Sequence, residues 1–178
     1  MKSARIHLYL FVAIAALMGA KATVLSAQEI YQSPRDFLGE AFNDNIPLAQ
    51  SLVIDSKMSD EAARILRHGY GVERIGYWSE GAQTVWILEE IGRYRPITVG
   101  LIVSNGEIET IRVLVFRESH GWEVRHAFFT DQFKGLSLDA DNNLTANVDG
   151  ISGATLSVNA LRNLARLALY FDEKVQGE

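Results

Sequence analysis

The chain has 178 residues, no cysteine, and 17 lysines and arginines against 22 acidic residues, a net charge of −5. This length suits one domain, with or without an export segment, and 48% hydrophobic residues are enough for a real core. The lack of cysteine excludes disulfides, iron–sulfur clusters, CxxCH haem attachment, thiolate zinc sites and a lipoprotein anchor. The negative charge makes nucleic acid and anionic membrane surfaces poor partners.

Residues 1–27 have the pattern of a signal peptide. Lys2 and Arg5 precede an apolar run and then small residues, with cleavage sites after residue 22 or residue 27. Lys21 ends the run before the roughly 20 residues that a membrane span needs, so a cleaved signal is favoured over an N-terminal anchor. Cleavage after residue 27 would leave 14 basic and 22 acidic residues, a net charge of −8. Either outcome puts the rest of the chain outside the cytoplasm.

Residues 28–69 form an N-terminal helical region in this interpretation. Ser33-Pro34 is expected to open a short helix, because proline is tolerated in the first turn. A second helix is expected from Ser59 to His68, with Ser59 as its cap and Gly69 as its stop.

The middle of the chain favours strands. Four segments are rich in β-branched or aromatic residues and are separated by turn residues: Arg74–Ser79, Thr84–Ile91, Ile97–Ser104 and Ile108–Phe116. Asn105-Gly106 predicts a hairpin between the last two, since both residues tolerate positive φ. In the fourth segment Ile111, Val113 and Val115 alternate with Arg112 and Leu114, which predicts one buried face.

After Gly121 the periodicity becomes helical, Asp139–Asn143 reads as a polar loop, and Ala154 to about Lys174 carries the apolar stripe of a long helix. The predicted class is α+β: an antiparallel sheet packed by helices, with residues 70–178 forming the functional domain.

The start of this long helix carries the clearest chemical signal, Asp149-Gly-Ile-Ser152-Gly153-Ala154-Thr155-Leu-Ser157. Ser152 is placed to cap the helix, while Gly153 and Ala154 remove bulk and let a ligand approach the backbone. The free N–H groups and the positive dipole end of a first turn favour a phosphate. Thr155 adds a hydroxyl, either as a contact or as an attachment point.

This stretch resembles the flavinylation motif of the FMN-binding domain family, which includes the covalent-flavin subunits of sodium-pumping quinone reductase and of the Rnf complex. The motif has Asp, two variable residues, Ser or Thr, Gly-Ala, Ser or Thr, and a further Ser or Thr two positions on; Asp149, Ser152, Gly153, Ala154, Thr155 and Ser157 fit without departure. The resemblance implies that an ApbE-type, magnesium-dependent flavin transferase moves FMN from FAD to Thr155. It also implies that Asp149 serves recognition or transfer.

The resemblance extends upstream, over Pro96 to Gly135. The family has a Glu-Thr-Pro-Gly segment here, and this chain keeps Glu118 and Gly121 but has Ser119 and His120 between them. Glu118 is expected to touch the flavin ring or ribityl chain, and Trp122 is the best aromatic candidate for a ring contact. Five other aromatic residues are better explained as core: Trp78, Trp86, Phe128, Phe129 and Phe133.

The expected function is that of an exported flavoprotein carrying FMN covalently on Thr155 and transferring electrons to redox partner proteins, including membrane-bound ones. It would act in the periplasm, or on the outer face of the cytoplasmic membrane if the N-terminal segment stays uncleaved. The sequence shows no catalytic acid or base for a small substrate, so an electron carrier is favoured over a dedicated enzyme. Two alternatives stay open: a secreted binding or scaffold module without covalent flavin, and a flavin-dependent reductase of a small acceptor.

Overall fold

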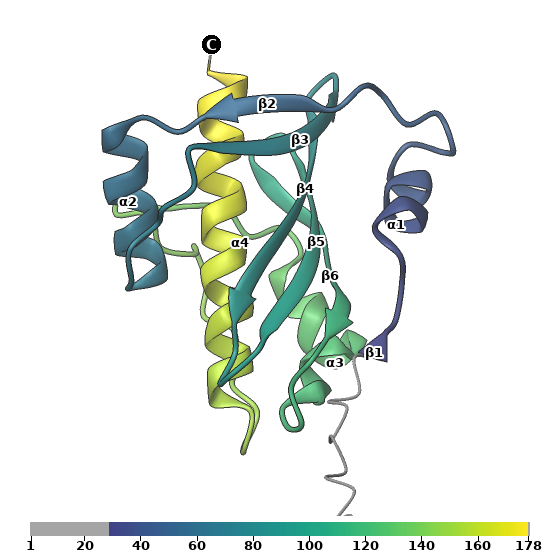
Figure 1. The fold of residues 1–178 in the computed structure, drawn as a ribbon, viewed down its shortest axis with the longest axis vertical. Helices are drawn as coiled ribbons and strands as arrows, with labels where there is room; N and C mark the ends of the chain where they lie inside the picture. Colours follow the sequence, from purple (N-terminus) through teal and green to yellow (C-terminus); the bar gives the residue numbers. More distant parts are fainter. Residues whose placement is uncertain (1–28, 178) are drawn as a thin grey trace, which may run out of the picture.

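The computed structural model describes residues 29–177. The predicted signal peptide, residues 1–27, lies outside the described residues. Six antiparallel strands form one sheet in the order β1-β6-β5-β4-β3-β2, and four α-helices with two short 3-10 helices pack around it (Figure 1). The predicted α+β class, with a long C-terminal helix, is confirmed.

The four predicted strands appear close to their expected bounds: β3 (Arg74–Glu80), β4 (Gln83–Ile91), β5 (Pro96–Ser104) and β6 (Glu107–Phe116). The predicted hairpin turn between β5 and β6 is also present. Asn105 has φ 52° and Gly106 has φ 77°, the positive values that a tight hairpin turn requires.

Both faces of the sheet are covered. Ile97, Val99 and Leu101 of β5 belong to a core shared with α4 (Thr155–Gln176), whereas Ile102 of β5 packs in a second core with Phe37 of α1 (Pro34–Ala41). Figure 1 shows these helices on opposite sides of the sheet. This arrangement corrects the expectation of a single buried face.

The second core explains two features of the central strands. Leu114 of β6, expected on the outer face, is 0% exposed because it packs in the core with Phe37. Gly100 of β5 lies directly under Phe37, and a Cβ there would be 2.5 Å from Phe37 Cε1. Helix α1 can therefore approach the sheet closely only because residue 100 has no side chain.

The N-terminal helices begin at local caps. Ser33 caps α1 as its Oγ accepts from the Asp36 N–H at 3.1 Å, with Pro34 in the first turn as predicted. Helix α2 spans Ser56–Leu66 and begins earlier than expected, because Asp55, not Ser59, is its cap and accepts from the Met58 N–H at 2.8 Å. It ends at Arg67, which takes the left-handed conformation at φ 65°, rather than at Gly69.

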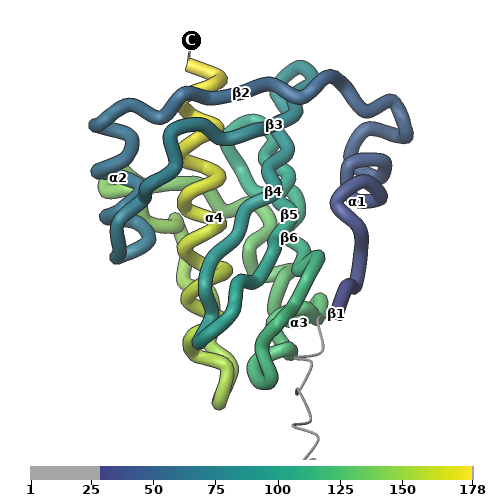
Figure 2. The backbone as a smooth tube through the Cα atoms, viewed as in Figure 1, coloured from purple at the N-terminus to yellow at the C-terminus, as the bar shows by residue number. Residues whose placement is uncertain are grey.

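Residues 28–69 also contribute two strands to the sheet. Strand β1 (Glu29–Ile30) pairs with the end of β6, and β2 (Gln50–Val53) pairs with β3 at the opposite edge. The sequence signal was weak because β1 has two residues and β2 buries only Leu52. Figure 2 follows this segment from one edge of the sheet, through α1, to the other edge.

Between β6 and α4 the chain forms three short helical turns rather than one helix: η1 (Trp122–Arg125), α3 (Ala127–Thr130) and η2 (Asp131–Phe133). The expected polar loop follows, with Asp139 Oδ1 accepting from the N–H groups of Asp141 and Asn143. Among residues 29–177, no helix combines the length and the apolar character that a membrane crossing requires.

Candidate functional site

The predicted motif lies where a surface loop enters α4. Thr155 is the first residue of this helix and Ala154 is its cap residue. In Figures 1 and 2 the start of α4 lies at the lower end of the molecule, as does the turn between β4 and β5. The loop 117–121 also reaches this end, so segments distant in sequence gather around the motif.

Thr155 is exposed at the start of a 22-residue helix. The first intrahelical bond is donated by Val158 to the Ala154 carbonyl, and Ala154 donates to the Ile151 carbonyl. Among the described residues, the N–H groups of Thr155, Leu156 and Ser157 have no acceptor. Such free donors at a helix start suit a phosphate group attached to the adjacent hydroxyl.

Ser152 does not cap the helix as expected. The cap position is Ala154, at φ −113° and ψ 17°, and no side chain accepts a hydrogen bond there. Ser152 is exposed instead, two residues before the cap and next to Gly153, whose φ is 82°. The first turn is therefore left open, since no side chain among residues 29–177 satisfies its donors.

The other small residues of the motif pack against the loop that follows β6. Ala154 and Ser157 are 2% and 4% exposed. A Cβ added to Gly121 would lie 2.5 Å from Ser157 Oγ and 3.5 Å from the Ala154 Cβ. The motif and the upstream segment that resembled the same family are thus in direct contact, as one site requires.

Glu118 binds the turn between β4 and β5. Its Oε1 accepts from the N–H groups of Arg93, Tyr94 and Arg95 at 2.5, 2.5 and 2.8 Å. Burial opposes ionisation, but these three donors and the charge of Arg93 outweigh it, so the pKa of Glu118 is lowered. Glu118 is a charged anchor for the turn, and its predicted flavin contact would have to use Oε2, which accepts no bond from the described residues.

Trp122 directly follows Gly121 and starts η1, which contacts α4. Its side chain is 44% exposed, with Arg125 5.2 Å from its ring centroid and His126 edge-on at 5.4 Å. Phe128, 63% exposed, stacks on His126 at 6.1 Å. An exposed aromatic surface therefore continues from the site along η1 and α3.

Four of the five other aromatic residues pack in or against the cores as predicted, and the prediction is wrong for Phe128. Trp86, Phe129 and Phe133 are each 0% exposed and belong to the core shared with α4, and Trp78 packs partly buried against the second core. These four serve packing. Phe128 is the exception, because its ring is largely in solvent.

Asp149 is exposed, and its carboxylate takes part in one weak contact, from Asn147 Nδ2 at 3.3 Å. The backbone around it is held firmly: the Asp149 N–H donates to Gln132 Oε1 at 2.6 Å, and Arg162 of α4 donates to the Val148 carbonyl. The loop is fixed while its carboxylate stays free for a partner.

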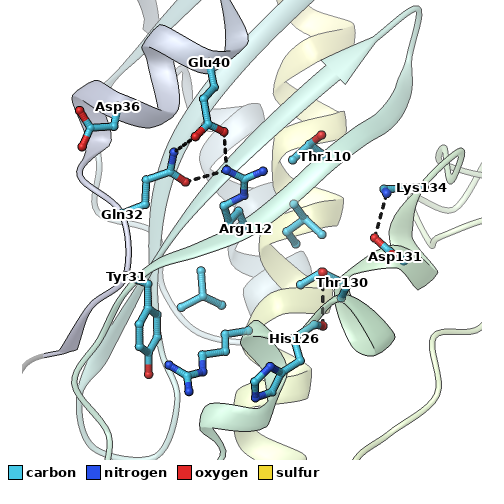
Figure 3. A pocket seen from close by; sticks show the side chains of 14 residues that line it. Tyr31, Gln32, Asp36, Glu40, Thr110, Arg112, His126, Thr130, Asp131 and Lys134 are labelled. Carbon is cyan, nitrogen blue, oxygen red and sulfur yellow. Dashed lines mark hydrogen bonds and ion pairs between the residues drawn. The ribbon is translucent and has the colours of Figure 1, made fainter.

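No residue of the motif lines either of two pockets on the described surface. One of about 740 Å³ lies between the segment around α1 and the turns after β6 (Figure 3). Its charged side chains are largely paired with one another: Arg112 binds Glu40 and Gln32, and Lys134 binds Asp131. Thr155 stands on open surface instead. Within residues 29–177 no three potential metal-ligating side chains gather.

The sequence pointed to Glu118 but not to the turn it holds. Gly92, which precedes the three donor residues, marks that turn; a Cβ there would approach Glu118 Oε1 to 3.2 Å. Gly92 and Glu118 are 26 positions apart, and no local pattern links them.

A match to a known domain family supports a flavin-binding protein. Residues 92–170 match the family model of the FMN-binding domain, which supports an FMN-binding domain of this family over that part of the chain. The match includes Glu118, Trp122 and the whole motif, and it supports FMN as the cofactor. No curated protein matches the chain.

Proposed function

We propose that the protein is an exported electron-transfer flavoprotein in which FMN is esterified through its phosphate to Thr155. The observation that carries the proposal is the open first turn of α4. There an exposed threonine hydroxyl stands beside three backbone N–H groups that lack acceptors among the described residues. A phosphate bound to this oxygen would meet those donors and the positive end of the helix dipole.

Attachment by an ApbE-type transferase uses FAD and balances as a phosphoryl transfer. The Thr155 oxygen forms a bond to the phosphorus on the flavin side of FAD, the bond from that phosphorus to the bridging oxygen breaks, AMP leaves, and the hydroxyl proton passes to solvent. Exposure of Thr155 supports this step, because the hydroxyl has to enter another enzyme's active site. The free carboxylate of Asp149, six residues earlier, is available to that enzyme as a recognition group.

The flavin, once attached, supplies the electron chemistry, and the protein supplies tether, orientation and electrostatics. Trp122 is the side chain proposed to contact the isoalloxazine, because it is half-exposed and its segment η1 contacts α4. Glu118 would keep the neighbouring turn in place and set a negative charge near the cofactor. The open surface around Thr155 suits a carrier whose ring edge has to approach partner proteins.

The test is the intact mass of the exported chain, co-produced with an active flavin transferase. The proposal predicts a gain equal to FMN less one water, visible flavin absorbance that survives denaturation, and loss of both in Thr155→Ala. Thr155→Ser retains a hydroxyl and should be modified.

Thr145→Ala is the matched control, because Thr145 is an exposed threonine outside the motif and its loss should leave the mass gain intact. An unmodified wild-type chain, with the transferase shown active on another substrate, would reject the covalent proposal and favour a binding module. Turnover of a small acceptor by the purified flavoprotein would instead favour the reductase alternative over a carrier.

A further inference from the structure

A second pocket, of about 500 Å³, lies on the side of α4 that faces the C-terminal end of α2. It is enclosed by Arg67, by residues 143–148 of the loop that leads to the motif, and by residues 159–166 of α4. Figure 2 shows the segment before α4 running close to α2 and α4 at this side of the molecule.

The charged side chains that line this pocket are all basic. Its polar side chains are three arginines, four asparagines and one threonine, and no aspartate or glutamate lines it. The whole chain, by contrast, has 22 acidic residues against 17 basic ones. A concave surface that concentrates guanidinium and amide donors in an acidic protein selects anions.

The three arginines are not neutralised by carboxylates. None of Arg67, Arg162 and Arg166 forms an ion pair among the described residues. Arg162 donates to the Asn159 side chain and the Val148 carbonyl, and Arg166 Nε donates to the Asn142 carbonyl at 2.6 Å. These neutral partners orient the guanidinium groups and leave their charge available.

Two further guanidinium groups, those of Arg64 and Arg67, act on Arg166. Burial, followed by the charges of Arg64 and Arg67, lowers the pKa of Arg166, and Glu61 and Asp139 only partly offset this. Glu61 already binds Arg64 and the Asn142 side chain, and Asp139 accepts from two backbone N–H groups. These two carboxylates are therefore engaged with other groups.

We propose that this pocket binds a small anion with at least two negative charges, held by Arg67, Arg162 and Arg166 and oriented by the asparagine amides. Guanidinium groups bind phosphate and carboxylate oxygens in the same forked geometry, so the shared ligand chemistry is that of phosphate esters and dicarboxylates. The volume suits a ligand up to the size of a nucleotide. The site is separate from Thr155, and the proposal does not depend on flavin attachment.

Binding of an anion in this pocket would also affect the motif. Arg162 holds the Val148 carbonyl, and Val148 directly precedes Asp149. Arg162 lies seven residues after Thr155 on the same helix, about 10 Å along its axis. An anion that draws Arg162 toward itself would shift the loop that presents the motif.

The test is isothermal titration calorimetry of the exported chain, and of Thr155→Ala, at fixed physiological ionic strength. The probes are AMP, pyrophosphate and succinate, with adenosine as the uncharged counterpart of AMP. Saturable binding of at least one anion below about 10 mM, without binding of adenosine, is expected. AMP and pyrophosphate test whether the pocket binds phosphate groups, and succinate tests whether it binds carboxylate groups.

The variants locate the binding. Arg67→Gln and Arg166→Gln should each weaken the bound anion about tenfold or more. Arg35→Gln is the matched control, because Arg35 is an exposed arginine on α1, across the sheet, and its loss should have no effect. The Arg67 side chain makes no hydrogen bond in the described fold, so the Arg67→Gln variant keeps the test valid if Arg166→Gln unfolds. Absence of saturable binding by all three anions, or equal weakening by Arg35→Gln, would overturn the proposal.

Discussion

Gly121 and Ser157 contact each other so closely that a single added carbon at residue 121 would lie 2.5 Å from Ser157 Oγ. Gly121 also has φ 85°, a conformation that side chains disfavour. This contact joins the loop after β6 to the first buried turn of α4. The position of the start of α4 relative to Glu118 and Trp122 therefore depends on a residue without a side chain.

Gly121→Ala should lower the free energy of unfolding by about 3 kcal/mol, because it combines backbone strain with a clash. Gly135→Ala is the control: φ at Gly135 is 74°, but nothing lies within 4 Å of the added carbon, so strain alone costs about 1 kcal/mol. Chemical denaturation measures both values. Ser157→Ala in the Gly121→Ala background should recover part of the loss, since it removes the 2.5 Å contact. Equal losses for the two glycine variants would contradict the contact.

Glu118→Gln keeps the shape of the side chain and an acceptor oxygen but removes its charge. The lowered pKa of Glu118 means that the carboxylate stabilises the fold above its unfolded value near 4.5 and that this stabilisation is lost as pH falls through the folded pKa. We expect the variant to be less stable at pH 7 by about 1 kcal/mol, since the site is partly open to solvent. The difference should be smaller at pH 3, because more of the carboxyl is protonated there. Urea denaturation at both pH values checks this, and a difference independent of pH would be inconsistent with a charged anchor.

Asp149→Ala should slow flavin attachment and leave the stability of the fold nearly unchanged. The Asp149 carboxylate is exposed and has one weak contact, so its removal should change the unfolding free energy by less than about 0.5 kcal/mol. The rate of FMN incorporation by the transferase should nevertheless fall by tenfold or more, if one charge-assisted hydrogen bond to the enzyme is lost. A time course of flavin incorporation, read by protein absorbance, measures the rate. An unchanged rate would remove Asp149 from the recognition step.

Asp172 on α4 is a buried acid in the main core, 2% exposed, and accepts from Thr84 Oγ1 at 2.6 Å. Burial raises its pKa, so the protonated form is favoured in the folded state and the fold loses stability as pH rises from the unfolded value of 3.8 through the folded pKa. Asp172→Asn keeps an acceptor for Thr84 and cannot ionise. Its stability relative to wild type should therefore be higher at pH 8 than at pH 4, by about 1 kcal/mol or more. Denaturation curves giving the same difference at both pH values would argue against a buried, titrating carboxyl.

Local signals were enough for much of this fold. Asn105-Gly106 specified a hairpin because its backbone preference is intrinsic, and the apolar stripe of α4 specified a long helix. Strand β1 was not predicted because two residues carry no periodicity, and β2 was not predicted because it buries only Leu52. The second core at Phe37 was missed because pairing α1 with Gly100 requires knowledge of the tertiary fold.

Sequence patterns likewise predicted one part of the candidate site and not the other. The motif was found because its residues are contiguous. Ser152 was wrongly predicted as the cap because α4 begins at Thr155, two residues later than a helix capped by Ser152 would begin. The clamp of Glu118 on the turn before β5, and the arginine pocket between Arg67 and α4, both join residues far apart in the chain. No spacing rule along the sequence reveals such contacts.

The most direct test of the central claim is tandem mass spectrometry of the flavinylated chain after trypsin digestion. Cleavage after Lys134 and Arg162 releases one peptide, residues 135–162, which contains the whole motif and the hydroxyl residues Ser137, Thr145, Ser152, Thr155 and Ser157. We predict that this peptide carries the mass of FMN less one water and that the fragment series places it on Thr155. The same mass on another hydroxyl, or an unmodified peptide from a chain that retains flavin colour, would contradict attachment at the open turn of α4.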